Sequence, residues 1–103
     1  MSLFSIFGGA KKDDKVRTML DDGAIILDVR TKAEFASGHV KGSKNIPVQV
    51  IQQNISTIKG WNKPIVACCQ SGMRSGSATS ILKGAGIDCV NGGPWTRVQN
   101  ALS

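Results

Sequence analysis

The stretch Pro64–Gly84 constrains the fold of this chain more than any other part of the sequence. It begins with a short apolar run that predicts a buried strand, and it continues with Ala78, Ile81 and Leu82 at the spacing of one helix face. The loop between them, Cys69–Arg74, starts with a thiol and contains a glycine. A turn of this kind directs backbone N–H groups and the positive end of the helix dipole at one point. It therefore favours an anion, and a thiolate is an anion.

Cys69 is the candidate nucleophile in this loop. A free cysteine has a pKa of about 8.5, and we expect the helix N-terminus and the neighbouring Arg74 to lower it. The only histidine, His39, lies in another segment, so no general base is adjacent in the sequence. The reaction should therefore need little proton transfer. Attack of a thiolate on a sulfane sulfur meets this condition, because the persulfide product is again an anion that backbone amides can hold.

Several motifs carry a resemblance to a known family. The loop Cys69–Ser75, with the sequence Cys-Gln-Ser-Gly-Met-Arg-Ser, resembles the active-site loop Cys-x-x-Gly-x-Arg/Thr of single-domain rhodaneses. Upstream, the pieces Asp28–Arg30, Glu34–Phe35 and Gly38–His39 resemble the family's Asp-Val-Arg, Glu-Phe and Gly-His motifs. The resemblance runs from about Asp21 to the C-terminus, so the chain is identified as a member of the rhodanese-like sulfurtransferases.

This resemblance implies a sulfurtransferase similar to the thiosulfate:cyanide enzymes, and no cofactor is expected. It would move a sulfane sulfur from a small anionic donor, thiosulfate or a persulfide, through a Cys69 persulfide to cyanide, a thiol or an acceptor protein. The residues expected to contact the substrate are the rest of the loop and one tryptophan: Gln70, Ser71, Gly72, Met73, Arg74, Ser75 and Trp95. Many rhodaneses have an arginine where this chain has Gln70, so we expect thiosulfate to be a poor donor.

Four residues outside the loop have more than one interpretation. Asp28 and Arg30 end a strand, where an acid and a guanidinium more often tie loops together than catalyse, and we favour that structural role. His39 has no second ligand at metal-binding spacing, so we predict a structural histidine and no metal site. Trp95 follows the paired glycines more closely than the rhodanese tryptophan does, which leaves open whether it walls the substrate pocket or packs in the core.

Two other functions stay open. Related folds use Cys-x5-Arg loops in phosphatases and arsenate reductases, but only four residues separate Cys69 from Arg74 here, which favours a smaller loop suited to sulfur. The chain could instead be a binding or sulfur-carrier module that docks on a partner and relays sulfur without turnover of a small donor. The sequence fits such a relay and a free-standing transferase equally.

Alternating strands and helices predict the α/β class, and the resemblance implies the three-layer rhodanese-like fold. We expect a central, mostly parallel sheet of about five short strands with helices on both faces, and a ligand site beyond the carboxyl ends of the strands. Residues 24–29 predict a central strand, residues 48–58 one amphipathic helix, and residues 86–90 the last strand before a tight loop. Residues 1–10 are expected to form an apolar tail, and residues 11–103 the domain.

Local patterns predict further details. Thr31, with Glu34 three residues later, predicts a capping box at the start of a helix. Side chains alternate along a strand, so we expect Cys68 to point away from Cys69 into the core. Cys89 comes two residues after Ile87 and directly before Val90, and it is also expected in the core.

The composition indicates which partners the protein can bind and in which cellular compartment we expect it. The net charge is +6, but the basic residues are scattered, so we expect attraction of small anions or an acidic protein and no nucleic-acid role. Three cysteines without framework spacing fit a reducing compartment. No stretch approaches the roughly 20 apolar residues that span a bilayer, and the apolar start lacks the charge of a signal peptide. We therefore expect a cytoplasmic protein without a membrane role.

Overall fold

The computed structural model describes the backbone of residues 8–102 and the side chains of residues 14–102. The bounds of its elements are, in chain order, α1 (Gly8–Asp21), β1 (Ile25–Asp28), α2 (Lys32–Ala36), β2 (Lys44–Asn45), the 3-10 turns η2 (Val48–Val50) and η3 (Gln52–Asn54), α3 (Ile55–Gly60), β3 (Ile65–Cys69), α4 (Met73–Gly84), β4 (Cys89–Pro94) and α5 (Trp95–Ala101). Within this described part, no helix has the length and apolar character needed to cross a membrane.

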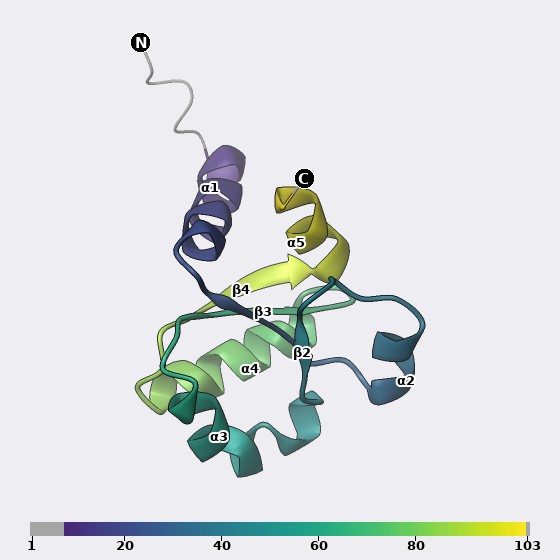
Figure 1. Cartoon of the computed structure of the whole chain (residues 1–103), viewed down its shortest axis with the longest axis vertical. Helices are drawn as coiled ribbons and strands as arrows, with labels where there is room; N and C mark the ends of the chain where they lie inside the picture. Colours follow the sequence, from purple (N-terminus) through teal and green to yellow (C-terminus); the bar gives the residue numbers. More distant parts are fainter. Residues whose placement is uncertain (1–7, 103) are drawn as a thin grey trace.

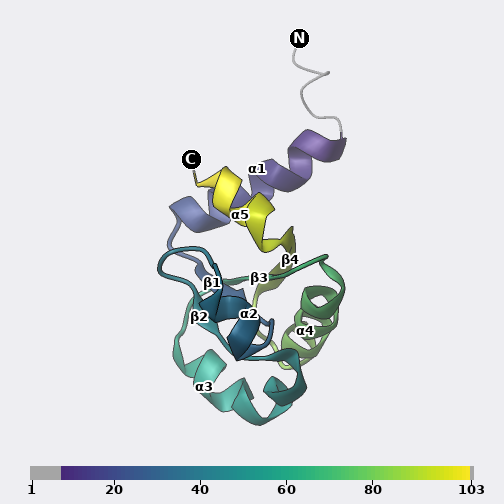
Figure 2. The same ribbon diagram turned by 90° about the vertical axis from the view of Figure 1, so that its right-hand side faces the viewer.

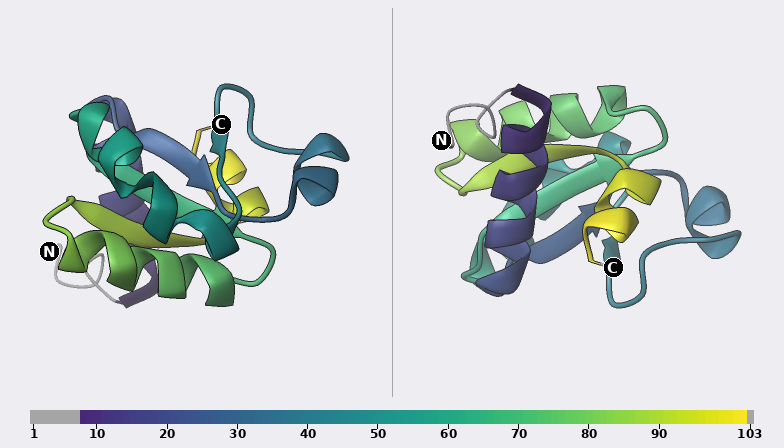
Figure 3. Two further views of the ribbon diagram at one scale, coloured as in Figure 1. Left: turned by 90° about the horizontal axis from the view of Figure 1, so that it is seen from below. Right: turned by 90° about the horizontal axis from the view of Figure 1, so that it is seen from above.

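These elements form a three-layer α/β fold around one sheet (Figure 1). The strands lie in the order β2-β1-β3-β4, and every neighbouring pair is parallel. Helices α1 and α5 lie on one side of the sheet and α3 and α4 on the other, as Figure 2 and Figure 3 show from further directions. The class and the parallel sheet are confirmed. Residues 8–102 contribute four strands instead of about five, because helical turns take up the segments between the strands.

The sheet is buried on both faces because its side chains alternate between two cores. Leu27 of β1 packs in the core beneath α3 and α4, whereas its neighbour Ile26 packs in the core beneath α1 and α5. All residues of β3 are buried, and Val66 shares the second core. Cys68 packs in the core beneath α1 and α5, and Cys69 in the one beneath α3 and α4, so the predicted alternation is confirmed.

The predicted capping box at the start of α2 is also confirmed. The Thr31 hydroxyl accepts a hydrogen bond from the Glu34 N–H at 3.2 Å, and the Glu34 carboxylate accepts one from the Thr31 N–H at 3.0 Å. Close to the end of the helix, Phe35 stacks on His39 with ring centroids 3.6 Å apart. The box holds the Glu34 carboxylate at a fixed place on the surface of α2.

The single helix expected over residues 48–58 is wrong. The chain instead makes the turns η2 and η3 and then the short helix α3. The β-branched residues Val48, Val50 and Ile51 lose side-chain freedom in a helix, which weakens the first turn. Ile51 is fully buried in the core beneath α3 and α4, and that packing is compatible with 3-10 turns.

The last strand is longer than expected and starts later. We predicted a strand over residues 86–90 and a tight loop over residues 91–95, but β4 extends from Cys89 to Pro94. The paired glycines therefore belong to the sheet, and α5 begins at Trp95, directly after Pro94. The prediction failed because glycines usually end strands, whereas here they lie within an irregularity of the sheet.

This irregularity is a shift of the β3–β4 register by one residue at Gly92, immediately after the pairing of Asn91 with Ala67. A β-carbon on Gly92 would lie 2.8 Å from side-chain atoms of Val66 and of Val98. Real β-carbons do not approach so closely, so only glycine allows β4 to run this near to β3 and α5. The shift places the end of β4 beside the loop that follows β3.

The division of the chain into a tail of residues 1–10 and a domain of residues 11–103 stays a prediction. Helix α1 begins at Gly8, so its first three residues fall within the expected tail of residues 1–10. The first seven residues of the expected tail lie outside the described residues.

Candidate active site

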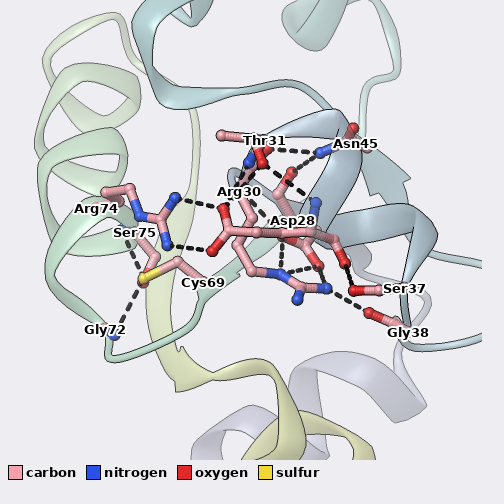
Figure 4. Close-up of polar contacts among 11 residues, drawn as sticks. Asp28, Arg30, Thr31, Ser37, Gly38, Asn45, Cys69, Gly72, Arg74 and Ser75 are labelled. Carbon is pink, nitrogen blue, oxygen red and sulfur yellow. Dashed lines mark hydrogen bonds and ion pairs between the residues drawn. The ribbon is translucent and has the colours of Figure 1, made fainter.

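Cys69 lies at the end of β3, under the turn that leads into α4 (Figure 4). Three donors converge on its Sγ atom: the Gly72 N–H at 3.0 Å, the Ser75 N–H at 3.4 Å and the Ser75 hydroxyl at 3.3 Å. We call these three donors the sulfur cradle. Cys69 itself has 0% exposure, a burial that the sequence did not predict. The loop therefore both covers the sulfur and supplies its hydrogen bonds.

The cradle lowers the pKa of the Cys69 thiol below its ordinary value. Burial acts in the opposite direction, but the hydrogen bonds from the Ser75 hydroxyl and from the backbone of Ser75 and Gly72 outweigh it. For the other two thiols burial prevails. It raises the pKa of Cys68 to about 12 and also raises the pKa of Cys89. Of the three cysteines, Cys69 alone is shifted toward the thiolate.

Gly72 makes the sharp turn of the cradle possible. Its φ angle is +99°, in the left-handed region that favours glycine. A β-carbon at this position would also lie 3.3 Å from the Cα atom of Gly93 in β4, so the loop and the strand are close together. The Gly72 carbonyl accepts a hydrogen bond from the Gly76 N–H at 3.0 Å, which starts the hydrogen-bonding pattern of α4.

Arg74 binds a carboxylate instead of the cysteine. Its Nη1 and Nη2 atoms donate to the two carboxylate oxygens of Glu34 at 2.8 and 3.1 Å. We expected Arg74 to lower the pKa of Cys69, but the contributions that do so most come from Ser75 and Gly72. The Arg74 bond and the Thr31 N–H together lower the pKa of Glu34 to about 2. Arg74 thus fastens the start of α4 to α2, forty residues away along the chain.

Asp28 and Arg30 form a buried, bidentate ion pair at the end of β1. The Arg30 Nε donates to Oδ1 at 2.9 Å, and its Nη2 donates to Oδ2 at 2.7 Å. The same Nη2 donates to the Gly38 carbonyl at 2.7 Å, and the guanidinium lies 4.8 Å from the ring centroid of Trp95. These contacts join β1 to the turn after α2 and to the start of α5, and a structural role stays our interpretation of the pair.

The described contacts of Trp95 do not connect it with Cys69. The ring lies under the Arg30 guanidinium, next to Gly38, and packs against the core beneath α1 and α5. His39 likewise lies apart from the cysteine, and its Nδ1 atom is 2.6 Å from the Phe35 carbonyl. Trp95 is the one predicted contact residue outside the loop, and among residues 14–102 no described contact joins it to the sulfur.

The remaining loop residues form an exposed tip above the cysteine. Gln70 and Ser71 are exposed, and Met73 is 80% exposed. Ser71 accepts a hydrogen bond from the Met73 N–H at 3.4 Å, which helps to close the turn. These side chains are therefore the part of the loop that is open to solvent.

Asn91 of β4 contacts the loop, although it is not among the residues that the sequence predicts at the site. Its side chain bonds the Gly72 carbonyl at 2.9 Å and the Ser75 hydroxyl at 2.7 Å. We had placed this residue in a loop after the last strand. The signal that predicts this contact is the alternation of a strand: if the strand continues through the glycines, Asn91 shares with Cys89 the face that α4 covers.

A sequence model of the rhodanese-like domain family matches residues 12–94 of the chain. The chain belongs to the rhodanese family. Thiosulfate sulfurtransferase PspE of Escherichia coli is 32% identical to this rhodanese over 76 residues, which cover 73% of the chain and 65% of the relative. The uncharacterized protein YqhL of Bacillus subtilis is 38% identical over 60 residues, which cover 58% of the chain and 47% of the relative. The rhodanese thus spans about half to two thirds of the length of these curated relatives.

The crystal structure of a rhodanese-like domain protein from Staphylococcus aureus has the same fold. It superposes with a TM-score of 0.70 at 29% identity, covering 84% of this rhodanese and 86% of that chain. The expected rhodanese-like fold is therefore confirmed, and the family includes relatives that are named sulfurtransferases.

The ion pair between Glu34 and Arg74 should survive in acid. Because the folded-state pKa of Glu34 is lowered from 4.5 to about 2, its stabilising contribution is present above pH 4.5 and is lost as the pH falls through about 2. Glu34 is the only glutamate in the sequence, so the NMR signal of its side-chain carboxyl carbon can be followed without ambiguity. We expect a midpoint near 2, and a midpoint closer to 4.5 in Arg74→Gln.

The matched control for this titration is Arg17→Gln, which removes an exposed arginine of α1. It should leave the Glu34 midpoint unchanged. A wild-type midpoint near 4.5 would contradict the ion pair.

Proposed function

We propose that this rhodanese is a sulfurtransferase that carries a sulfane sulfur as a persulfide on Cys69. The observation that supports this most directly is the sulfur cradle, because donors converging on one buried sulfur stabilise an anion there. Membership of the family gives a second support, since relatives such as PspE of Escherichia coli are named thiosulfate sulfurtransferases.

The transfer takes place in two displacement steps. In the first, the Cys69 thiolate attacks the outer sulfur of the donor, and the bond between that sulfur and the rest of the donor breaks. The leaving group keeps the electron pair and departs as sulfite from thiosulfate, or as a thiolate from a persulfide. In the second, an acceptor thiolate or cyanide attacks the outer sulfur, and Cys69 departs as a thiolate. Neither step requires a protein base, in keeping with the distant position of His39.

Loading requires a path to a sulfur that is buried. Cys69 has 0% exposure beneath the exposed tip formed by Gln70, Ser71 and Met73. The tip must move aside for the donor, and it can then close over the persulfide. The negative charge of the persulfide is bound by the same backbone N–H groups that hold the thiolate.

The arginine of the loop favours sulfur chemistry over phosphate chemistry. A phosphatase would need the Arg74 guanidinium for its substrate, but both Nη atoms already bind Glu34. The exposed Met73 favours a protein among the acceptors, because its flexible side chain offers an apolar contact on the loop that covers the cysteine. A sulfur relay to such a protein uses the same two displacement steps.

Loading of Cys69 can be tested by the intact mass of the protein after incubation with thiosulfate and, separately, with a low-molecular-weight persulfide. We expect a gain of one sulfur atom that is absent in Cys69→Ala, because that variant lacks the attacking thiolate. Cys68→Ala is the matched control and should still gain the sulfur, since the Cys68 thiol is buried and its pKa is about 12. Failure of both donors to load the wild-type protein would contradict the proposed transfer.

The donor preference should depend on Gln70. An arginine at this exposed position can form a charge-assisted hydrogen bond to an anionic donor, so Gln70→Arg should raise the rate of loading from thiosulfate about tenfold. Gln53→Arg adds the same charge on the exposed turn η3 and should leave the rate close to wild type. Equal rates in Gln70→Arg and Gln53→Arg would show that the second loop position does not set the preference for thiosulfate.

A further inference from the structure

We propose that Asn91 is a positioning residue of this site, whose side-chain amide holds the loop at Gly72 and orients the hydroxyl of Ser75. The inference rests on the proposed function for the chemistry of Cys69 and concerns a residue of a different strand. Asn91 does not touch the sulfur in any described contact; it acts through two residues that do.

The orientation of the Asn91 amide follows from its partners. Its Nδ2 atom donates to the Gly72 carbonyl at 2.9 Å, and its Oδ1 atom accepts from the Gly93 N–H at 2.9 Å. Exchanging the oxygen and the nitrogen would set a carbonyl against a carbonyl and an N–H against an NH2, so both bonds require the present orientation. The Oδ1 atom therefore faces the Ser75 hydroxyl at 2.7 Å.

Ser75 has one hydroxyl proton and two neighbours, the Asn91 Oδ1 atom at 2.7 Å and the Cys69 Sγ atom at 3.3 Å. An amide oxygen can only accept, so Ser75 donates to Asn91 while Cys69 is a thiol, and the thiol proton is free to point at the Ser75 oxygen. When Cys69 ionises, Ser75 can turn its proton to the sulfur, and Oδ1 keeps the Gly93 N–H. The network can therefore give its polar groups hydrogen-bond partners both when Cys69 is a thiol and when it is a thiolate.

The fold leaves a space shaped for this amide. A β-carbon on Gly76 would lie 3.3 Å from the Asn91 Nδ2 atom, and one on Gly72 would lie 4.0 Å from it. The glycines of the first turn of α4 therefore make room for the side chain. The pairing of Asn91 with Ala67, just before the register shift, directs it to the face of the sheet that α4 covers.

Removing the amide should weaken the hold on the thiolate. Water can enter the space left by Asn91→Ala and accept a hydrogen bond from the Ser75 hydroxyl in place of the Oδ1 atom. It does not hold the Gly72 carbonyl in a fixed position, as the Nδ2 atom does. The Gly72 N–H, which makes the shortest hydrogen bond to the sulfur at 3.0 Å, then becomes less well directed. The charged neighbours stay as they are, because Arg74 is bound by Glu34 and Asp28 is bound by Arg30.

The test is an NMR titration of the Cys69 β-carbon, whose chemical shift reports the thiol and the thiolate without any sulfur donor. We expect the midpoint in Asn91→Ala to rise by about one pH unit, which is a tenfold smaller thiolate population at a given pH below the midpoint. Hydrogen exchange of the Gly72 amide should become faster in the same variant. A folded Asn91→Ala protein with the wild-type midpoint would overturn the proposal.

A second variant keeps the test decisive if Asn91→Ala does not fold. Gly76→Ala leaves Asn91 in place but pushes its amide aside, and it should also raise the Cys69 midpoint. The matched control is Gly84→Ala in the same helix, where a β-carbon would have no atom within 4 Å, and it should titrate like the wild type. Equal midpoints in Gly76→Ala and Gly84→Ala would count against the role of Asn91. Because no sulfur is transferred in this experiment, its result is independent of whether the protein loads a persulfide.

Discussion

The hydrogen bonds to the Cys69 sulfur are the interaction on which the rest of the site depends. A thiol with 0% exposure would normally stay protonated, because burial disfavours the charged form. Here the Gly72 N–H, the Ser75 N–H and the Ser75 hydroxyl outweigh that cost and lower the pKa. Cys68, the next residue on the same strand, shows the alternative, since burial raises its pKa to about 12. The difference between the two thiols comes from the loop and not from the strand.

The loop keeps this geometry because separate parts of the fold hold it. Asn91 fixes the loop from β4, where its pairing with Ala67 directs the side chain to the face that α4 covers. The pair of Glu34 and Arg74 fixes it from α2, where the capping box has already placed the carboxylate. Arg74, the arginine of the loop, binds Glu34, so the anion is held mostly by neutral donors. An uncharged cradle suits a reaction in which the negative charge passes from thiolate to persulfide and back.

Much of this arrangement could be predicted from local patterns. The strand before Cys69, the glycine turn and the capping box of Thr31 each follow from the order of neighbouring residues. The partner of Arg74 could not, because the two ends of that ion pair are forty residues apart. The register shift at Gly92 depends on how closely two strands approach, and it lets β4 continue past Asn91 to Pro94, beside the cysteine loop. The sequence alone contains no measure of that distance.

The central claim is that neutral hydrogen bonds hold Cys69 as a thiolate despite its burial, and the most direct measurement is its pKa. The ultraviolet absorbance of the thiolate can be titrated in the wild type and in Ser75→Ala, with Cys69→Ala subtracted as the baseline. We predict a wild-type pKa below that of an unperturbed cysteine and a higher value in Ser75→Ala, while Ser77→Ala, on the exposed side of the same helix, matches the wild type. A wild-type pKa at or above the unperturbed value would contradict the account.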